Sequence, residues 1–327
     1  MKKWMKLTAT MLVAAMAMTG CGGGSDAPAD DAAEGKVYTV GIVQQLEHVA
    51  LDAATAGFQD KLTEMLGEGN VVFDYQNAQG EQTNCTTIAT KFVSNGVDLI
   101  MANATTALQS AAAATADIPI VGTSVTDYVT AGVADSNDAP GRNVTGASDL
   151  APVDEQIALL KQVVPDAKKV AIVYCSAEPN SIFQSELAQE HLTAAGLEWA
   201  EYTAADSNEV QAVITKAISE CDTVYIPTDN TMANNMEIIK NVTLPAGVPV
   251  ICGEEGMCGV GGLATLSISY YDLGAKAAEM AYEILVNGAD PATMPIEYVS
   301  EGITAKYNAE AAEALGLTMP EGLVPIA

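Results

Sequence analysis

Basic residues are scarce in this sequence of 327 residues. It holds 14 Lys and Arg against 42 Asp and Glu, and Arg142 is the only arginine. Proteins that bind nucleic acid need clustered Lys and Arg to neutralise phosphates, so this deficit excludes a nucleic-acid-binding protein. It also argues against docking to an anionic lipid surface through charge.

Residues that commonly perform catalysis are also few. The only histidines are His48 and His191, and there is no Gly-x-Ser-x-Gly or Cys-x-x-Cys motif. The glycines of residues 256–262 do not follow a phosphate-binding or dinucleotide-binding spacing. His48 and Asp52 lie one helical turn apart, but a metal site would need further ligands. We therefore expect no enzyme, no cofactor and no metal site.

Long apolar runs are absent except near the N-terminus. A basic start precedes the short apolar run of residues 7–18, and the run ends at Thr19-Gly20-Cys21. This pattern predicts a signal peptide over residues 1–20 and lipidation of Cys21, as in bacterial lipoproteins. The Gly-rich and acidic residues 21–36 then form a flexible tether. The prediction is a protein outside the cytoplasm, lipid-anchored to the bacterial cell membrane; the alternative is an ordinary cleaved signal with Cys21 incidental.

The remaining five cysteines are Cys85, Cys175, Cys221, Cys252 and Cys258. Because five is an odd number, at least one is free or pairs outside the chain. The last two flank the Gly-rich stretch, and the sequence leaves open whether they form a disulfide or remain buried thiols.

Short apolar runs alternate with amphipathic stretches from residue 37 onward. Apolar positions 51, 54, 58, 62 and 65 lie on one face of a helix. Further helices are expected near 88–93 and from 106. The expected strands are residues 37–43, 71–75, 98–101 and 118–121. Strands alternating with helices predict an α/β fold with a parallel sheet covered on both faces.

The strand pattern then repeats. Residues 40–43 match 170–173, and residues 118–121 match 248–251, both at an offset of 130; residues 98–100 are echoed at 222–224. The repeat predicts two Rossmann-like lobes.

The last segment, with a strand at 263–269, a helix at 270–287 and a strand at 295–299, does not continue this repeat. We therefore expect several crossings between the lobes, near residues 147–152, 267–271 and 291–296. Lobe one then comprises 37–147 and 270–292, and lobe two 148–269 and 293–327. Such crossings predict a hinge with a cleft.

Ligands of open parallel sheets bind beyond the carboxyl ends of the strands. That rule selects the candidate ligand-binding residues Gln44, His48, Thr105, Thr106, Ser124, Asp127, Ser176, Glu178, Asn180, Ser181, Asp229, Asn230, Glu254 and Tyr270. For each Ser, Thr or Asn, the alternative role is that of a helix N-cap.

The selected loops contain acids but no Lys or Arg. This inventory suits a ligand with an ammonium group and a single carboxylate, because helix N-termini at 105–106 or 180–181 can hold one carboxylate. Asp229 is the first choice for the ammonium group. Its alternative role is to cap the helix that follows it.

Five ordered motifs resemble one known family. They are Leu46–Asp52, Asn143–Asp149, Glu178–Ser181, Pro227–Asn230 and Tyr270–Gly274. They resemble the tryptophan/tyrosine type of ABC-importer substrate-binding lipoproteins, which have the type I periplasmic-binding fold. The resemblance implies a non-enzymatic receptor that closes on an aromatic amino acid and delivers it to a membrane permease with its ATPase. The Cys-containing residues 254–258 depart from the usual pattern of the family.

Three alternatives remain open at this point. A ligand sensor on the same fold would not take part in transport, and neighbouring permease and ATPase genes would distinguish it. An enzyme built on the lobes would need a nucleophile and a base, which the sequence lacks. A receptor of the same kind for a nucleoside or a sugar differs only in its ligand.

Overall fold

A computed structural model describes residues 36–299 and 303–326 of the chain. The expected signal peptide, Cys21 and all but the last residue of the expected tether lie outside the described residues. From Lys36 onward, the chain forms one compact unit that contains two β-sheets.

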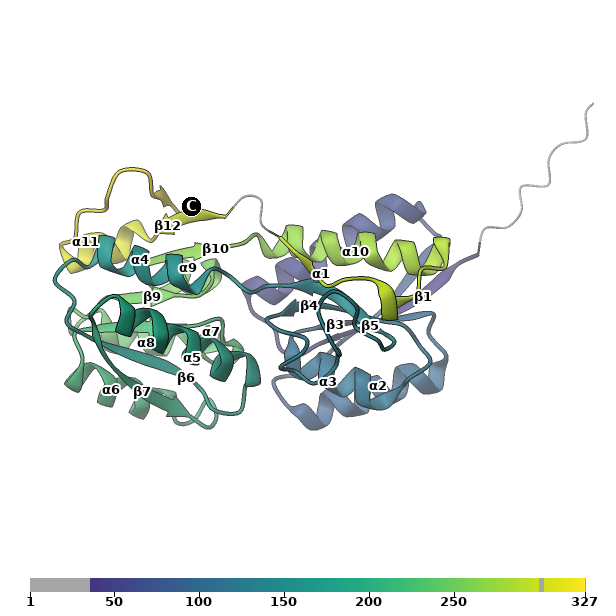
Figure 1. Ribbon diagram of the computed structural model, residues 1–327, viewed down its shortest axis with the longest axis horizontal. Coiled ribbons are helices and arrows are strands. Elements are labelled where there is room, and N and C mark those ends of the chain that lie inside the picture. The colour runs from purple at the N-terminus through teal and green to yellow at the C-terminus, as the bar shows by residue number, and fades with distance from the viewer. Residues whose placement is uncertain (1–35, 300–302, 327) are drawn as a thin grey trace, which may run out of the picture. The chain divides into compact units, whose positions relative to one another are not determined.

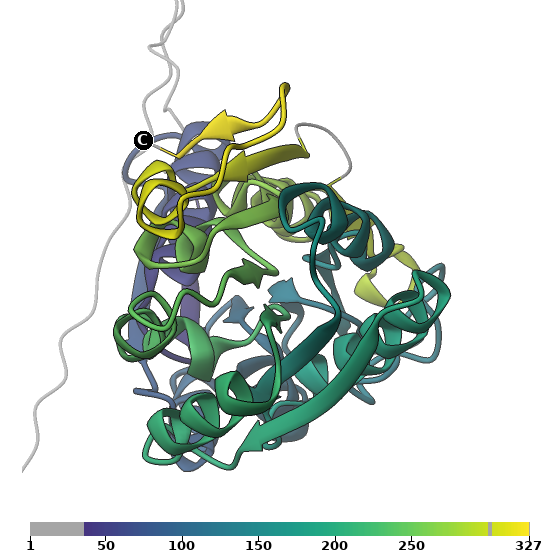
Figure 2. The same ribbon diagram turned by 90° about the vertical axis from the view of Figure 1, so that its left-hand side faces the viewer.

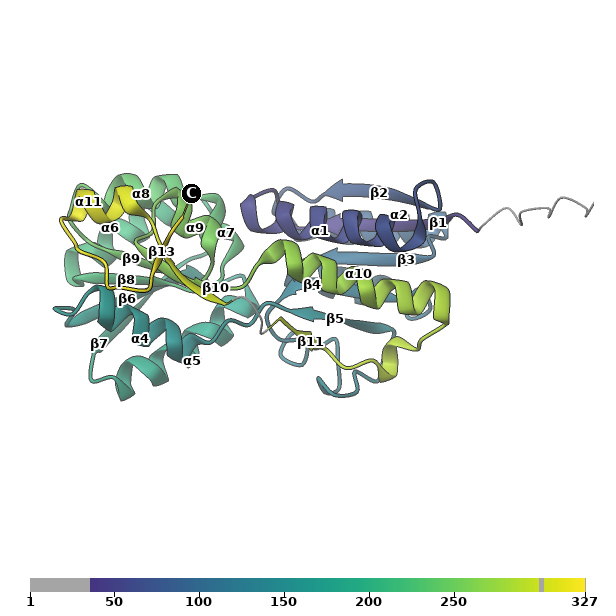
Figure 3. The same ribbon diagram turned by 90° about the horizontal axis from the view of Figure 1, so that it is seen from above.

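The first sheet has six strands in the order β11-β5-β4-β3-β1-β2, as Figure 3 shows, and Figure 1 labels β1, β3, β4 and β5. All its neighbouring strands run parallel. Its strands are β1 (Tyr38–Gln44), β2 (Val71–Asn77), β3 (Leu99–Asn103), β4 (Ile120–Val125), β5 (Val144–Ser148) and β11 (Glu297–Tyr298).

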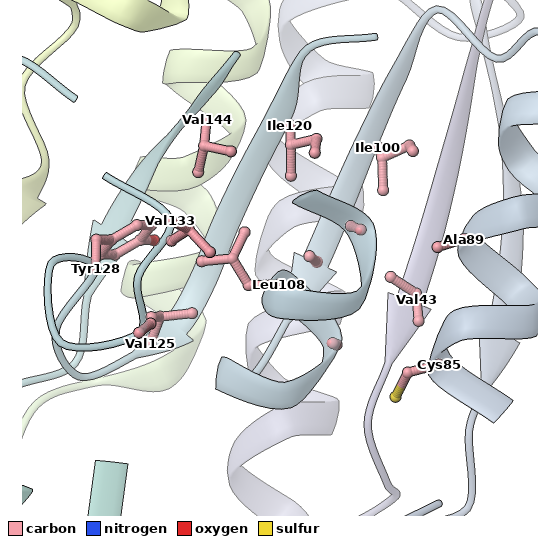
Figure 4. Close-up of a cluster of buried hydrophobic side chains, with 14 of the residues drawn as sticks. Val43, Cys85, Ala89, Ile100, Leu108, Ile120, Val125, Tyr128, Val133 and Val144 are labelled. Atoms are coloured by element: carbon pink, nitrogen blue, oxygen red, sulfur yellow. The ribbon is translucent and has the colours of Figure 1, made fainter. Parts of the chain in front are cut away.

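Helices cover both faces of this sheet. One face packs against α2 (Gln82–Asn95) and α3 (Thr105–Ala114), and Figure 4 shows side chains of this core layer. The other face packs against α1 (Val49–Leu66) and α10 (Tyr270–Asn287), which lie side by side in Figure 3. A short 3-10 helix, η1 (Pro291–Thr293), follows α10. Because helices cover both faces of the sheet, most strand residues are apolar and buried instead of alternating between apolar and polar.

The helices α1 and α10 approach each other closely at two glycines. A Cβ atom on Gly274 would overlap the carbonyl oxygen of Ala54, and one on Gly57 would overlap the carbonyl oxygen of Tyr271. The two backbones therefore meet directly, which only residues without a side chain permit.

The second sheet has seven strands in the order β13-β12-β10-β9-β8-β6-β7. Its strands are β6 (Lys169–Cys175), β7 (Glu198–Ala204), β8 (Thr223–Ile226), β9 (Val250–Cys252), β10 (Ala264–Ser267), β12 (Thr304–Tyr307) and β13 (Val324–Pro325). Strand β12 runs antiparallel to β10, and the two lie beside each other in Figure 2.

Helices cover both faces of the second sheet as well. One face carries α6 (Val210–Glu220), α7 (Asn230–Asn234), α8 (Met236–Thr243) and α9 (Glu255–Val260). The other carries α4 (Val153–Val163), α5 (Pro179–Ala194) and α11 (Ala309–Leu315). Trp199 is partly buried in β7, and its Nε1 donates to Oγ1 of Thr193 at 2.9 Å.

The two sheets share one strand order, which confirms the predicted two-lobed α/β fold. The order β5-β4-β3-β1-β2 in the first sheet recurs as β10-β9-β8-β6-β7 in the second. The predicted helix at 270–287 coincides with α10.

The boundary expected near residue 293 is wrong. Glu297 and Tyr298 form β11, which pairs with Ala147 and Ser148 of β5 in the first sheet. Thr145 Oγ1 also donates to the carbonyl of Met294 at 3.0 Å, and so holds the approach to this strand. The open edge of β5 thus keeps this segment in lobe one. The chain is therefore still in the first sheet at Tyr298 and is in the second sheet at Thr304, so it does not cross at 291–296.

All five cysteines of the described chain are buried free thiols, so Cys252 and Cys258 form no disulfide. Across residues 36–299 and 303–326, no group of three or more His, Cys, Asp or Glu side chains is arranged to hold a metal ion. No helix in the same residues combines the length and apolar character needed to cross a membrane.

Candidate functional site

A small pocket lies between the two lobes, and we call it the inner pocket. Its walls follow the carboxyl ends of strands from both sheets, as expected for open parallel sheets. It is lined by His48, Leu51, Ser124, Asp149, Asn180, Thr228, Asp229, Asn230, Ala233, Glu254 and Tyr270. Of the described residues, those that line it include no Lys and no Arg.

A second cavity of about 540 Å³, the outer groove, also has walls from both lobes. Lobe one contributes Gln45, Leu46, residues 79–82, Thr106 and Gln109. Lobe two contributes Cys175, residues 177–179, residues 205–208, Thr231 and Asn234. Side-chain amides dominate this lining, and the described residues that form it include no aromatic ring and no basic group.

Direct contacts join the lobes around the inner pocket. His48, at the start of α1, lies 3.1 Å through Nε2 from Oδ1 of Asn230. Since an amide oxygen only accepts, the imidazole must donate this hydrogen bond. Burial lowers the pKa of His48 below its ordinary value, which favours the neutral ring. Gln184 Nε2 of lobe two also donates to Thr126 Oγ1 of lobe one at 3.4 Å.

The carboxylate of Asp229 is engaged by the backbone. Oδ1 accepts from the amide of Met232 at 2.8 Å, and Oδ2 accepts from the amide of Cys175 at 2.6 Å. Asp229 therefore caps α7, which is the alternative role that the sequence left open. Burial raises its pKa, and the neighbouring carboxyl of Glu178 adds to this shift.

Glu178 and Glu254 are held in the same manner. Glu178 accepts from the amides of Asn230 and Thr231 at 3.0 and 2.8 Å, and from their side chains at 2.8 and 2.7 Å. Glu254 caps α9 by accepting from two backbone amides, those of Gly256 and Met257. Burial raises the pKa of Glu254 to about 7. The helix-start amides favour the charged form of these acids and offset part of the effect of burial.

The structure brings together half of the candidate residues. The inner pocket is lined by His48, Ser124, Asn180, Asp229, Asn230, Glu254 and Tyr270. Thr106 and Glu178 line the outer groove. Neither lining includes Gln44, Thr105, Asp127, Ser176 or Ser181.

Two of these outlying residues have structural roles instead. Gln44 donates to Oδ1 of Asp52 at 2.7 Å and accepts from Thr55, which fixes the start of α1. Asp127 Oδ1 accepts from the amide of Thr130 within its own turn.

Four residues of the inner pocket were not predicted: Leu51, Asp149, Thr228 and Ala233. Asp149 directly follows β5, a strand that the sequence pattern does not reveal. Its position at the first expected crossing was the available signal. The sequence pattern placed Leu51 on the apolar face of a helix, so it was not considered as a pocket residue. Because Leu51 lies near the start of α1, it contacts both the core and the inner pocket.

A family model described as "ABC transporter substrate binding protein" matches residues 39–327. The chain belongs to this family. It is also 38% identical over 268 residues to a tyrosine-binding protein of Clostridioides difficile, a match that covers 81% of this chain and 77% of that protein.

Two solved structures of substrate-binding proteins differ in how well they superpose. A protein from Streptococcus pneumonia in complex with L-Trp is 32% identical, with a TM-score of 0.86 and coverage of 89% of this chain and all of that one. A ligand-free, open protein from Clostridium difficile with adhesive properties is 38% identical, with a TM-score of 0.69 and coverage of 89% and 99%. This substrate-binding protein therefore superposes better on the tryptophan complex, although its sequence is more similar to the open protein.

Proposed function

We propose that this ABC transporter substrate-binding protein is a lipid-anchored receptor that closes on an aromatic amino acid in the inner pocket. It acts without catalysis and delivers the ligand to a membrane permease with its ATPase. The observation that carries the proposal is that both lobes contribute residues to the inner pocket. In addition, the chain superposes better on the tryptophan complex than on the ligand-free, open relative.

The chemistry of the inner pocket supports a zwitterionic ligand. Acidic, amide and hydroxyl side chains surround it, and its described lining residues include no Lys or Arg that could clamp a second carboxylate. Leu51, Ala233 and the ring of Tyr270 are the apolar members of the lining. The pocket has a volume of about 10 Å³, so an aromatic ligand would enter only when the lobes move apart. A dicarboxylate or a phosphate would lack a partner here.

Calorimetry on the mature protein tests the ligand. We expect heat with at least one of tryptophan, tyrosine and phenylalanine, and none with glutamate, because a second carboxylate has no cationic partner. Heat with a nucleoside or a sugar, and with none of the three aromatic amino acids, would reject this ligand and leave the receptor role in place.

Ligand binding is expected to close the lobes by motion at the three crossings. The ligand-free protein should be more open, because the hydrogen bonds His48–Asn230 and Gln184–Thr126 join the lobes only through neutral groups. Small-angle X-ray scattering should then give a smaller radius of gyration at saturating ligand than without ligand. Identical scattering curves in both states would contradict closure.

Cys21 is expected to anchor the protein to the outer face of the cytoplasmic membrane. The expected result for Cys21→Ser is release from the membrane pellet into the soluble or secreted fraction, because no lipid can then be attached. Cys85→Ser, which changes a cysteine buried in lobe one, is the control and should stay in the pellet. Equal retention of both variants would argue against the anchor.

A further inference from the structure

Asp149 is a buried carboxylate that neither a cation nor a helix start compensates. It is 3% exposed, and it lines the inner pocket at the crossing between β5 and α4. Oδ1 accepts from Thr126 Oγ1 at 3.0 Å, and Oδ2 accepts from the hydroxyl of Tyr270 at 2.9 Å. No ion pair found within the described residues includes Asp149.

This environment sets Asp149 apart from the other acids of the cleft. Glu178 and Glu254 each accept from two backbone amides at the start of a helix, and Asp229 accepts from one such amide, that of Met232, and from the amide of Cys175 at the end of β6. Asp149 has two neutral hydroxyl donors from other residues, and burial raises its pKa although these hydroxyls and its own backbone amide favour the charged form. A buried carboxylate in this state favours a positively charged partner over remaining alone.

Two further polar atoms of the same pocket have no partner among the described residues. They are Oγ of Ser124 in lobe one and Oδ1 of Asn180 in lobe two. Ser124 also has a φ of 55°, in the left-handed region that a non-glycine residue rarely occupies. Strain and unpaired buried groups of this kind concentrate at ligand sites.

We propose that Asp149, rather than Asp229, receives the α-ammonium group of the ligand at the crossing, and that Oδ1 of Asn180 in lobe two accepts a second N–H. This assignment rests on the proposed function, since it requires a ligand with an α-amino group. The hydroxyl of Ser124 is then free to donate to the α-carboxylate. Tyr270 acts as a positioning residue, because its hydroxyl holds the carboxylate of Asp149.

The assignment gives the ammonium group a part in closure. An ammonium group has three N–H donors, which suits acceptors that come from two sides. Contacts to Asp149 at the crossing and to Asn180 of lobe two form together only when the lobes meet. A ligand without its amino group would lose both.

The experiment compares L-tryptophan with indole-3-propionate, which lacks the α-amino group, by calorimetry on three proteins. Wild type should prefer tryptophan. Asp149→Asn should weaken tryptophan binding by about 10–150-fold, because a hydrogen bond to a charged group contributes about 1.5–3 kcal/mol and 1.4 kcal/mol is tenfold. Its affinity for indole-3-propionate should not fall. Asp229→Asn tests the rival assignment: it should keep the preference for tryptophan over indole-3-propionate, whatever its effect on the affinity for both ligands through the cap of α7.

Tyr270→Phe provides a second variant in case Asp149→Asn does not fold. It removes the hydroxyl that positions Asp149 and leaves the carboxylate in place. Tryptophan affinity should fall about fivefold, the equivalent of one neutral hydrogen bond of about 1 kcal/mol, while indole-3-propionate is unaffected. Equal weakening of both ligands would contradict the positioning role.

The outcomes separate this assignment from the proposed function. If wild type binds tryptophan and Asp149→Asn keeps the full preference over indole-3-propionate, the assignment is overturned and the function stands. Loss of the preference in Asp229→Asn would return the role to Asp229. If wild type binds neither tryptophan nor any other aromatic amino acid, both are overturned.

Discussion

Replacing Gly274 by alanine is expected to lower the free energy of unfolding by about 2–3 kcal/mol, although alanine is the better helix former by about 1 kcal/mol. The new methyl group would overlap the carbonyl oxygen of Ala54, so α1 and α10 would have to move apart. Denaturation by urea, followed by circular dichroism, measures the change. The melting temperature should fall by roughly 2–4 °C for each kcal/mol lost.

Gly259→Ala in α9 is the matched control. A Cβ there would lie 3.6 Å from Cγ2 of Ile326, which is an ordinary contact. This variant should be as stable as wild type or slightly more stable. Gly274→Ala with wild-type stability would show that the close approach of α1 and α10 has no energetic importance.

Glu178→Ala is expected to cost about 3 kcal/mol or more of stability. The side chain accepts four hydrogen bonds from Asn230 and Thr231, and a bond to a charged acceptor contributes about 1.5–3 kcal/mol before water replaces part of it. Because Asn230 lines the inner pocket, tryptophan affinity should also fall, by about tenfold or more. Chemical denaturation and calorimetry measure the two effects.

Glu190→Ala, at an exposed position in α5, the helix that Glu178 directly precedes, serves as the control. Its stability should stay within about 0.5 kcal/mol of wild type. If Glu178→Ala behaves like this control, water from the outer groove satisfies the freed groups completely, and Glu178 does not hold the wall of the pocket.

The two-lobed α/β architecture could be predicted because it depends on patterns that are visible in the sequence itself. Apolar runs of strand length, helical spacing and an offset of 130 residues are local signals, and α10 coincides with its predicted range. Strand β5 carries no such signal. Its sequence, Val-Thr-Gly-Ala-Ser, is short and mostly small, and all five residues are buried by their neighbours rather than by their own pattern.

Gly146 shows why β5 could not be predicted from the sequence alone. Its φ of 153° and the hydroxyl of Tyr128 leave no room for a side chain, so the residue is fixed by a partner 18 positions earlier. Strand β11 is similar, because its two residues form a strand only by pairing with the edge of β5. Tertiary contacts of this kind leave little local signal in the sequence.

The site was predictable only in part, for a different reason. The rule that ligands bind beyond strand ends identified the right loops, but not which side chains point into the pocket. Asp229 was chosen because it is an acid in such a loop, and the sequence cannot show that both its oxygens are already occupied by amides. Asp149 was missed because its strand was missed.

The position of Trp199 makes the protein convenient for optical measurements. Trp199 lies in β7, outside the residues that line the inner pocket, and Trp4 belongs to the expected signal peptide. A mature Trp199→Phe protein would then contain no indole of its own, at the cost of one hydrogen bond to Thr193. Indole fluorescence from a sample of this variant with bound tryptophan would then come from the ligand alone. The wavelength of its emission maximum would report how far water is excluded from the bound ligand.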